Sequence, residues 1–320
     1  LGEKKNVNLP GVKVEIPVIS EKDRVDIIDF GVKNKIDMIA LSFTRSVECV
    51  RMCRDVLRTK GKDIKIIPKI ENHEGVKNID EILKESDGLM IARGDLGMEM
   101  EPQKLFLAQK YLTSRAIALH KPVIVATQML ESMTKNSRPT RAEITDVGQA
   151  VVDLNDATML SGETGNGNYP LESIITMSNI CKEVEDNIDY LNNFNQTVAT
   201  MNSKELEKHS LAISAIKLAF SSKSECIVCI SDNIEFVQSL SSLRPNSYIF
   251  YPTDNQDNSR CLQLNFGVVP IVVESSILKD RTQLIKKIAE KIKIFEIKNV
   301  SHKIILVDAI HNNISLHNSN

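Results

Sequence analysis

The alternation of short apolar runs with helix-like segments, between residue 20 and about residue 195, is the feature that most constrains the fold. Each apolar run is followed by a stretch with helical periodicity. The five runs are residues 37–43, 64–69, 88–93, 122–127 and 157–161. Strands that are apolar along their whole length are typical of parallel sheets with both faces covered. Regular β-then-α order therefore predicts a parallel sheet, either open and doubly wound or closed as a barrel.

Polar side chains follow these runs at the points where the strands should end. They are Lys69 and Glu71, then Asp95, then Thr127, and finally Ser161 and Glu163. For one strand alone, solvated charges at its end would be a sufficient explanation. The same feature, however, recurs at about the 30-residue interval of a βα unit. Because (β/α) barrels carry their chemistry at the carboxyl ends of their strands, this recurrence predicts a site there.

A second domain is predicted after residue 195. Residues 192–204 are rich in Asn, Thr and Ser and lose periodicity, so we place the boundary there and expect domains 1–195 and 196–320. The C-terminal part begins with a helix-like segment, residues 206–220. Four strand-like runs follow it, at residues 226–230, 247–251, 269–273 and 303–307. This pattern predicts a smaller α/β domain with its own sheet.

Composition excludes several classes of protein. The 320 residues include 40 basic and 42 acidic ones, for a net charge of −2, so we expect neither a nucleic-acid nor a membrane-surface partner. No apolar segment approaches the roughly 20 residues that span a bilayer. The six cysteines follow no disulfide framework, and Cys226 and Cys229 lack a second ligand pair for zinc. A reducing, cytoplasmic location is expected, and because the chain begins at Leu1 we interpret it as a piece of a longer protein, with any targeting signal upstream.

The strand-end residues suit a divalent metal and an anionic substrate. Glu71 and Asp95 offer hard oxygen ligands, and Mg²⁺ takes one or two carboxylates together with substrate oxygens and water. Lys69 can stabilise negative charge on a transferred phosphoryl group or an enolate. Gly94 lets bare backbone N–H groups approach an anion, and Thr127 adds a hydroxyl.

Five motifs give the chain a resemblance to the pyruvate kinase family. They are "KIENHEGV" (69–76), "ARGDLG" (92–97), "ATQMLESM" (126–133), "NSRPTRAE" (136–143) and "MLSGET" (159–164). Each stands in the family's order and spacing. The resemblance is strong from about residue 4 to 185 and weaker but traceable after residue 209. It implies that the chain contains about five βα units from the C-terminal part of a (β/α)8 TIM barrel, followed by the family's α/β C-terminal domain.

The resemblance also implies an activity, the transfer of phosphate from phosphoenolpyruvate to ADP, and a role for each matching residue. Lys69 would stabilise the transferring phosphoryl group and the enolate, while Glu71 and Asp95 would hold Mg²⁺ or Mn²⁺. The substrate carboxylate would meet the backbone of Ala92, Arg93 and Gly94 together with Thr127. Thr127, Ser161 and Glu163 would lie near the proton path to the methylene carbon, and Lys5 and Asn8 on the nucleotide side.

Family members are also expected to use K⁺ and to form homotetramers. The family's first three barrel strands, its N-terminal segment and its lid domain would all precede Leu1, and with them the K⁺ ligands. Five units of a barrel expose two sheet edges, which is a liability for folding alone. We therefore expect residues 1–320 by themselves to be inactive and poorly soluble.

Three departures from the family pattern stand out. Pro68 precedes the lysine where a small residue is usual, and Gly148 and Gln149 replace the usual Ala-Asn pair; we expect small effects from both. Regulated members bind a sugar bisphosphate in a hydroxyl-rich and glycine-rich loop. Here that loop reads "SDNIEF" (231–236), whose Asp232 and Glu235 would repel phosphate. We expect that fructose 1,6-bisphosphate does not activate this protein.

Two alternatives remain open from the sequence. A different metal-dependent barrel enzyme of phosphoenolpyruvate or pyruvate, such as an aldolase, would share the Lys, Glu and Asp logic but not "ATQMLESM" or "TRAE". A truncated relative without catalytic activity would need none of the strand-end residues, yet Lys69, Glu71, Asp95 and Thr127 are all present.

Overall fold

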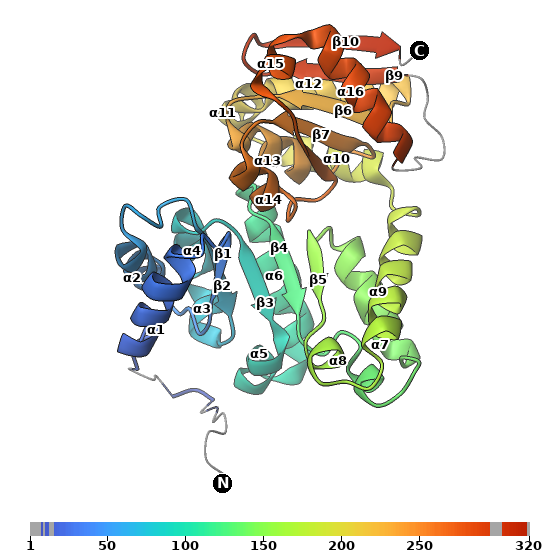
Figure 1. The fold of residues 1–320 in the computed structure, drawn as a ribbon. Helices are drawn as coiled ribbons and strands as arrows, with labels where there is room; N and C mark the ends of the chain where they lie inside the picture. Colours follow the sequence, from blue (N-terminus) through green and yellow to red (C-terminus); the bar gives the residue numbers. More distant parts are fainter. Residues whose placement is uncertain (1–7, 9, 13–15, 295–302, 319–320) are drawn as a thin grey trace. The chain divides into compact units, whose positions relative to one another are not determined.

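The computed structural model describes residues 8, 10–12, 16–294 and 303–318 of the chain. It divides into two compact units, Leu1–Ile188 and Asp189–Asn320 (Figure 1). The boundary predicted near residue 195 falls inside helix α10, Tyr190–Thr200, which belongs to the second unit.

The first unit is built on a parallel five-stranded sheet. Its strands are β1 Met38–Leu41, β2 Lys65–Ile70, β3 Leu89–Ala92, β4 Val123–Ala126 and β5 Ala157–Met159. They lie side by side in chain order, and every neighbouring pair is parallel. Each strand is followed by at least one helix before the next begins. The predicted series of five βα units is therefore confirmed.

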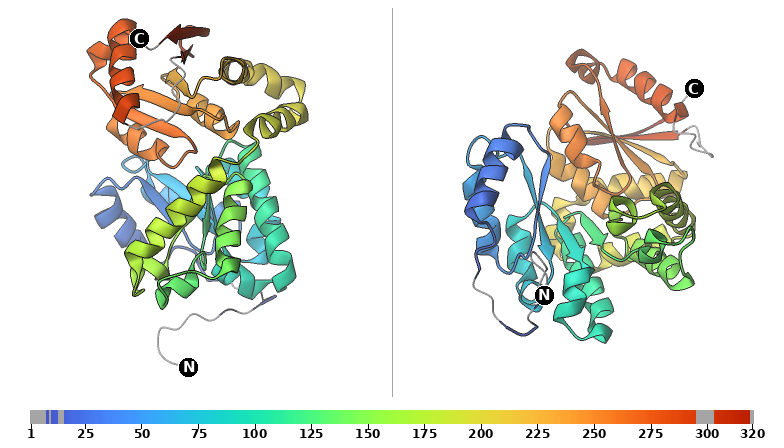
Figure 2. Two further views of the ribbon diagram at one scale, coloured as in Figure 1. Left: turned by 90° about the vertical axis from the view of Figure 1, so that its right-hand side faces the viewer. Right: turned by 60° about the horizontal axis from the view of Figure 1, so that its bottom comes forward.

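The helices of the first unit alternate with its strands along the chain, and capping boxes start two of them. They are α1 Glu21–Val25, the π-helix η1 Asp26–Val32, α2 Val47–Leu57, α3 His73–Lys77, α4 Ile79–Glu85, α5 Arg93–Glu99, α6 Pro102–Ala118, the 3-10 helix η2 Glu131–Thr134, α7 Arg141–Val152, α8 Gly162–Gly165 and α9 Pro170–Glu185. A capping box formed by Ser20 and Asp23 starts α1. A second one, formed by Thr140 and Glu143, starts α7. Helices α7 and α9 pack side by side (Figure 2).

Alternate strand residues of the first sheet point into one hydrophobic core. On β2, Ile66 and Ile70 are fully buried there, and on β3 so are Leu89 and Ile91. The helices α2, α4, α6 and α7 complete this core with Val50, Ile82, Leu112 and Val147 among other side chains. This packing fixes the direction of each strand. The carboxyl ends of the five parallel strands therefore lie at the same end of the sheet.

The connection between β2 and β3 contains two helices rather than one. They meet at Asn78, which ends α3 and precedes α4. The side-chain amide of Asn78 donates to the Arg45 carbonyl at 2.9 Å, a bond that ties this break to the loop after β1.

The second unit has a separate mixed sheet. Its strands are β6 Cys226–Ile230, β7 Tyr248–Thr253, β8 Val268–Val272, β9 Lys303–Asp308 and β10 Asn313–Asn318. Their spatial order is β10-β9-β6-β7-β8, and all pairs are parallel except β10 with β9. The predicted α/β domain is confirmed, while β10 is a strand that the sequence reasoning missed.

Helices cover both faces of the second sheet. They are α10 Tyr190–Thr200, α11 Ser203–Lys208, α12 Ser210–Ser222, α13 Ile234–Ser242, α14 Gln256–Leu262, α15 Ser275–Lys279 and α16 Arg281–Ile294. Cys229 packs in one core with α12 and α13, whereas Cys226 packs in the other with α16. Because these two cysteines lie on opposite faces of β6, they cannot ligate one metal ion together.

The segment predicted as an irregular boundary, residues 192–204, is largely helical. Asp189 caps α10 by accepting the N–H of Asn192 at 3.0 Å. Tyr190 and Phe194 are buried, and Phe194 belongs to the core beside α12 and α13. A few tertiary contacts thus override the weak helix propensity of the Asn and Thr residues. Across the described parts of the chain, no helix is both long enough and apolar enough to cross a membrane.

Candidate active site

The carboxyl ends of the strands in the first sheet carry the residues that the sequence analysis singled out. Lys69 lies in β2, and Glu71 directly follows that strand. Asp95 lies in the first turn of α5, which starts at the end of β3. Thr127 directly follows β4. Ser161 and Glu163 follow β5 within four residues. All of them therefore emerge at one edge of a parallel sheet.

Lys69 and Glu71 form the first part of the site. The Lys69 ammonium lies 2.8 Å from Glu71 Oε1 and donates to the Ser42 hydroxyl at 3.1 Å. The other carboxylate oxygen of Glu71 accepts the backbone N–H of Phe43. The Glu71 side chain is only 2% exposed, whereas that of Lys69 is 23% exposed. A buried carboxylate thus holds a lysine whose ammonium group still reaches the surface.

Asp95 and Asn8 form a second contact. The Asn8 side-chain amide donates to Asp95 Oδ1 at 3.2 Å. The segment predicted to lie on the nucleotide side therefore meets the predicted metal ligand. Lys5, the other residue of that prediction, lies outside the described residues.

Thr127 lies in an uncommon backbone conformation. Its φ is +77°, and that of the next residue, Gln128, is +55°. A β-branched residue rarely adopts a positive φ, so this turn is strained. A Cβ atom placed on Gly94 would lie 2.7 Å from the Thr127 Cγ2 methyl group. Glycine at position 94 therefore leaves the room that Thr127 occupies.

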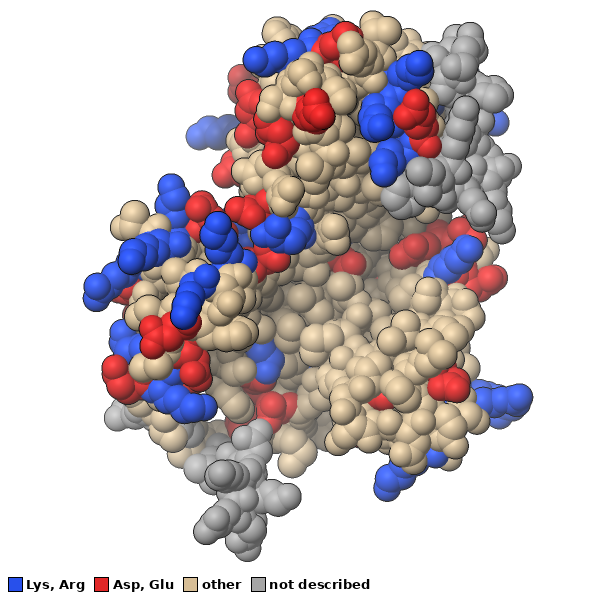
Figure 3. Space-filling model, in the orientation of Figure 1, with Lys and Arg blue, Asp and Glu red and all other residues tan. Residues whose placement is uncertain are grey.

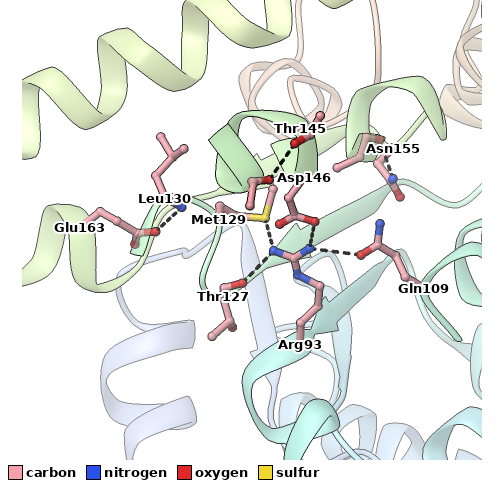
Figure 4. A network of polar contacts seen from close by, with 11 residues as sticks. Arg93, Gln109, Thr127, Met129, Leu130, Thr145, Asp146, Asn155 and Glu163 are labelled. Atoms are coloured by element: carbon pink, nitrogen blue, oxygen red, sulfur yellow. Dashed lines mark hydrogen bonds and ion pairs between the residues drawn. The ribbon is translucent and has the colours of Figure 1, made fainter. Parts of the chain in front are cut away.

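Arg93 points into the protein rather than toward solvent. Its side chain is 9% exposed, and its guanidinium contacts Asp146, Gln109, Met129 and the Thr127 carbonyl (Figure 4). Its side chain thus has protein partners, an arrangement compatible with the prediction that the backbone of residues 92–94 meets the substrate.

Glu163 is also directed inward. It is fully buried, and its two carboxylate oxygens accept the N–H of Leu130 at 2.9 Å and the N–H of Ser161 at 2.8 Å (Figure 4). In these contacts Glu163 joins the turn after β4 to the segment after β5. Ser161 itself is exposed.

The sequence analysis missed three residues of this neighbourhood. Ser42 and Phe43 follow β1 and contact Lys69 and Glu71. Ser42, a polar residue near the end of the apolar run 37–43, was the available signal, since the other runs of the series also end in polar residues. Asp146, in the middle of α7, pairs with Arg93 at 2.7 Å. No local pattern distinguishes Asp146 from the solvated acids of other helices.

The donor set fits a divalent cation. Glu71 and Asp95 follow neighbouring strands and provide carboxylate oxygens, the ligands that Mg²⁺ prefers. The Lys69 ammonium lies 2.8 Å from Glu71 Oε1, so this carboxylate already has a positively charged partner. A carboxylate oxygen has more than one lone pair, so each Glu71 oxygen can accept a further contact beside its present one.

Fold and site together define a protein of repeated βα units, with a parallel sheet and a lysine and carboxylate site at the carboxyl ends of its strands. Comparison with known proteins narrows this class. A family model described as "Pyruvate kinase, barrel domain" matches residues 1–174, and one described as "Pyruvate kinase, alpha/beta domain" matches residues 209–317. The chain belongs to the pyruvate kinase family.

Individual relatives agree with this assignment. The chain is 45% identical to a pyruvate kinase of Eimeria tenella over 97% of its own length, and 45% identical to one of Dictyostelium discoideum over 88%. A crystal structure of a pyruvate kinase from Cryptosporidium parvum matches with a TM-score of 0.92 and 39% identity, over 98% of this chain. The match covers 58%, 56% and 64% of those three proteins, respectively, so the chain spans less than two thirds of the length of each.

Proposed function

We propose that the full-length protein transfers the phosphoryl group of phosphoenolpyruvate to ADP, giving pyruvate and ATP. The observation that carries this proposal is the Lys69 ammonium, held by Glu71 and Ser42 at the end of β2. A fixed positive charge there can stabilise both a transferring phosphoryl group and the enolate that it leaves behind. The alternative of an aldolase-type enzyme is not supported, because both domains match pyruvate kinase.

The neighbouring residues have proposed roles that follow from their positions. Glu71 and Asp95 would hold Mg²⁺ or Mn²⁺, which neutralises substrate charge when bound. The backbone of residues 92–94 and the Thr127 hydroxyl would receive the substrate carboxylate. Thr127 would also lie near the carbon that gains a proton.

The other site residues have supporting roles in this proposal. Glu163 would position the turn after β4 rather than exchange a proton, because both of its oxygens accept backbone N–H groups. Ser161 would remain available to the proton path. Lys5 and Asn8 would lie on the nucleotide side, with Asn8 also orienting Asp95.

We further propose a cytosolic, K⁺-dependent homotetramer for the full-length protein. A cytosolic pyruvate kinase of Glycine max is 47% identical over 77% of this chain, which covers 48% of that protein. Exposed apolar side chains on the first unit could contact another subunit; they are Phe106, Leu107, Tyr111, Ile144, Val152, Leu171, Ile174 and Ile175. Figure 3 shows largely uncharged surface around α7, α8 and α9, beside a mixture of both charges elsewhere on the first unit. Light scattering after gel filtration would test the tetramer.

The activity is tested by Mg²⁺-dependent pyruvate formation from phosphoenolpyruvate and ADP, with the full-length protein. Lys69→Met should lower kcat at least about 1,000-fold, because it removes the charge that stabilises the transition state. Lys110→Met is the matched control, since Lys110 pairs with Asp153 on the helical side of the unit. An inactive wild-type protein, or equal losses in both variants, would exclude the proposed role of Lys69. The same assay on residues 1–320 alone tests the expectation that this segment is inactive.

A further inference from the structure

The turn after β4 needs support from its surroundings. Thr127 and Gln128 both have a positive φ, a conformation that costs on the order of 1–3 kcal/mol for each non-glycine residue. Such a conformation persists only where other contacts determine it. Other residues must therefore hold Thr127 in place.

Arg93 makes the contact that acts on this turn directly. Its Nη2 donates to the Thr127 carbonyl at 3.0 Å, and its Nη1 lies 2.7 Å from Asp146 Oδ1 (Figure 4). The planar guanidinium fork therefore spans from α7 to the turn after β4. Gln109 Oε1 accepts a longer bond of 3.4 Å from Nη1, and Met129 Sδ lies beside Nη2.

Asp146 supplies the charge that keeps Arg93 in this position. The other acceptors of Arg93 are a carbonyl, an amide and a thioether, all of them neutral. A nearly buried guanidinium without a carboxylate partner carries a large desolvation cost. Loss of the carboxylate would therefore favour a rotamer in which Arg93 reaches solvent and releases the Thr127 carbonyl.

We propose that Asp146 is a positioning residue, which acts through Arg93 to hold the turn at Thr127 and thereby places the Thr127 hydroxyl for the substrate. The inference rests on the proposed function, in which Thr127 meets the substrate carboxylate and the methylene carbon. Asp146 touches neither the substrate nor the metal. Its influence passes through two hydrogen bonds of one guanidinium group.

The experiment compares Asp146→Asn, Asp146→Glu and Arg93→Lys in the full-length protein. Asp80→Asn is the matched control, because Asp80 also pairs with an arginine, Arg115, at 2.6 Å in the same unit. For each variant we measure kcat, both KM values, the melting temperature and deuterium uptake into the methyl group of pyruvate. The last reaction requires the proton path but neither ADP nor phosphoryl transfer.

Asp146→Asn should lower kcat and methyl exchange by about 10- to 100-fold, since small misplacement of a reacting group has effects of this size. The KM for phosphoenolpyruvate should rise, while the KM for ADP and the melting temperature should change no more than in Asp80→Asn. Arg93→Lys should resemble Asp146→Asn, because lysine keeps the charge but loses the fork that reaches both partners. Asp146→Glu should recover part of the exchange rate.

Wild-type rates in Asp146→Asn, or a loss that follows the melting temperature and both KM values together, would overturn the inference. If Asp146→Asn does not fold, Arg93→Lys decides by the same criteria. An inactive wild-type protein would refute the proposed function instead. In that case crystal structures of the wild type and Asp146→Asn decide the positioning claim, and an unchanged Thr127 φ would refute it.

Discussion

Lys69 and Glu71, two residues apart, form an ion pair of 2.8 Å at the carboxyl end of β2. Side chains two apart in a strand share one face, so the strand itself brings the pair together. The carboxylate is buried and the ammonium is partly exposed. Glu71 therefore holds Lys69 in position, in addition to its proposed role as a metal ligand. Loss of this ion pair should affect the stability of the protein.

Removal of Lys69 should destabilise the protein as well as inactivate it. Lys69→Met removes the ammonium partner of the buried Glu71 carboxylate and leaves it the Phe43 N–H as its one partner among the described residues, at a cost of about 1–3 kcal/mol in the free energy of unfolding. In the double variant Lys69→Met/Glu71→Gln, the neutral amide oxygen still accepts that N–H, so much of the stability should return without activity. Urea unfolding without Mg²⁺ measures both variants. Equal stability of the single and double variants would contradict the pairing argument.

We expect the absence of a side chain at Gly94 to be as important for activity as the backbone N–H group that it offers. In Gly94→Ala the new methyl group would approach Thr127 Cγ2 to 2.7 Å, which forces the strained turn to move. We expect a loss of about tenfold or more in kcat/KM for phosphoenolpyruvate. The double variant Gly94→Ala/Thr127→Ser removes the clashing methyl group and keeps the hydroxyl, so it should recover activity relative to Gly94→Ala. Steady-state kinetics of the two variants and of Thr127→Ser test this, and no recovery would argue against a steric cause.

The parts of the site that depend on strand ends could be predicted, because apolar runs mark the strands and parallel order brings their ends together. The positions of Lys69, Glu71, Asp95 and Thr127 at or just beyond strand ends were predicted in this way. The pairing of Arg93 with Asp146 could not be, because 53 residues separate them and only the packing of α7 brings the two together. For the same reason the sequence could not show that the Arg93 side chain turns inward.

Two elements of the second unit show why local patterns fail. Helix α10 has the composition of a loop, and its buried Phe194 and partly buried Val198 connect it to the core beside α12 and α13. Strand β10 pairs with a single neighbour at the edge of the sheet, so its polar residues carry little strand signal. Both elements are specified by distant contacts rather than by their own residues.

Replacing one carboxylate oxygen of the buried Glu163 by an NH₂ group should destabilise the protein. Glu163→Gln keeps one acceptor oxygen but turns an NH₂ group toward either Leu130 N–H or Ser161 N–H. Two opposed donors in a buried site should lower the free energy of unfolding by about 2–4 kcal/mol. Urea unfolding measures this, with Glu172→Gln on the exposed face of α9 as the control. Similar stability of the two variants would show that Glu163 has no such structural role.

Fructose 1,6-bisphosphate should leave the kinetics of the full-length protein unchanged. In the loop after β6, Asp232 and Glu235 are exposed, and Asn233 Oδ1 accepts the Glu235 N–H at 2.8 Å to start α13. An anionic ligand would meet two negative charges there. Phosphoenolpyruvate saturation curves with and without the sugar bisphosphate, at matched ionic strength, should superimpose. A shift of the curve to lower substrate concentration would reveal an effector site of different chemistry.

Acid should destabilise the second unit through His209. Burial, together with the nearby Lys208, lowers the pKa of His209 below its ordinary value of 6.5, and its Nδ1 lies 2.7 Å from the Ser239 hydroxyl. The folded state therefore keeps a neutral ring at a pH where the unfolded chain binds a proton. Stability is intact above about pH 6.5 and falls below it by up to about 1.4 kcal/mol per pH unit, until the folded pKa is reached.

Urea unfolding of the whole chain at about pH 7.5 and about pH 5.5, followed by a probe in the second unit, measures this loss. His209→Gln has no proton to gain and can still bond Ser239, so its stability should depend less on pH over that interval. His73→Gln, at an exposed position in the first unit, is the control and should keep the wild-type dependence. Parallel pH dependences for the wild type and His209→Gln would assign the acid sensitivity of this unit to other groups. Asp308 is not one of them, because its pKa is lowered and it titrates below this range.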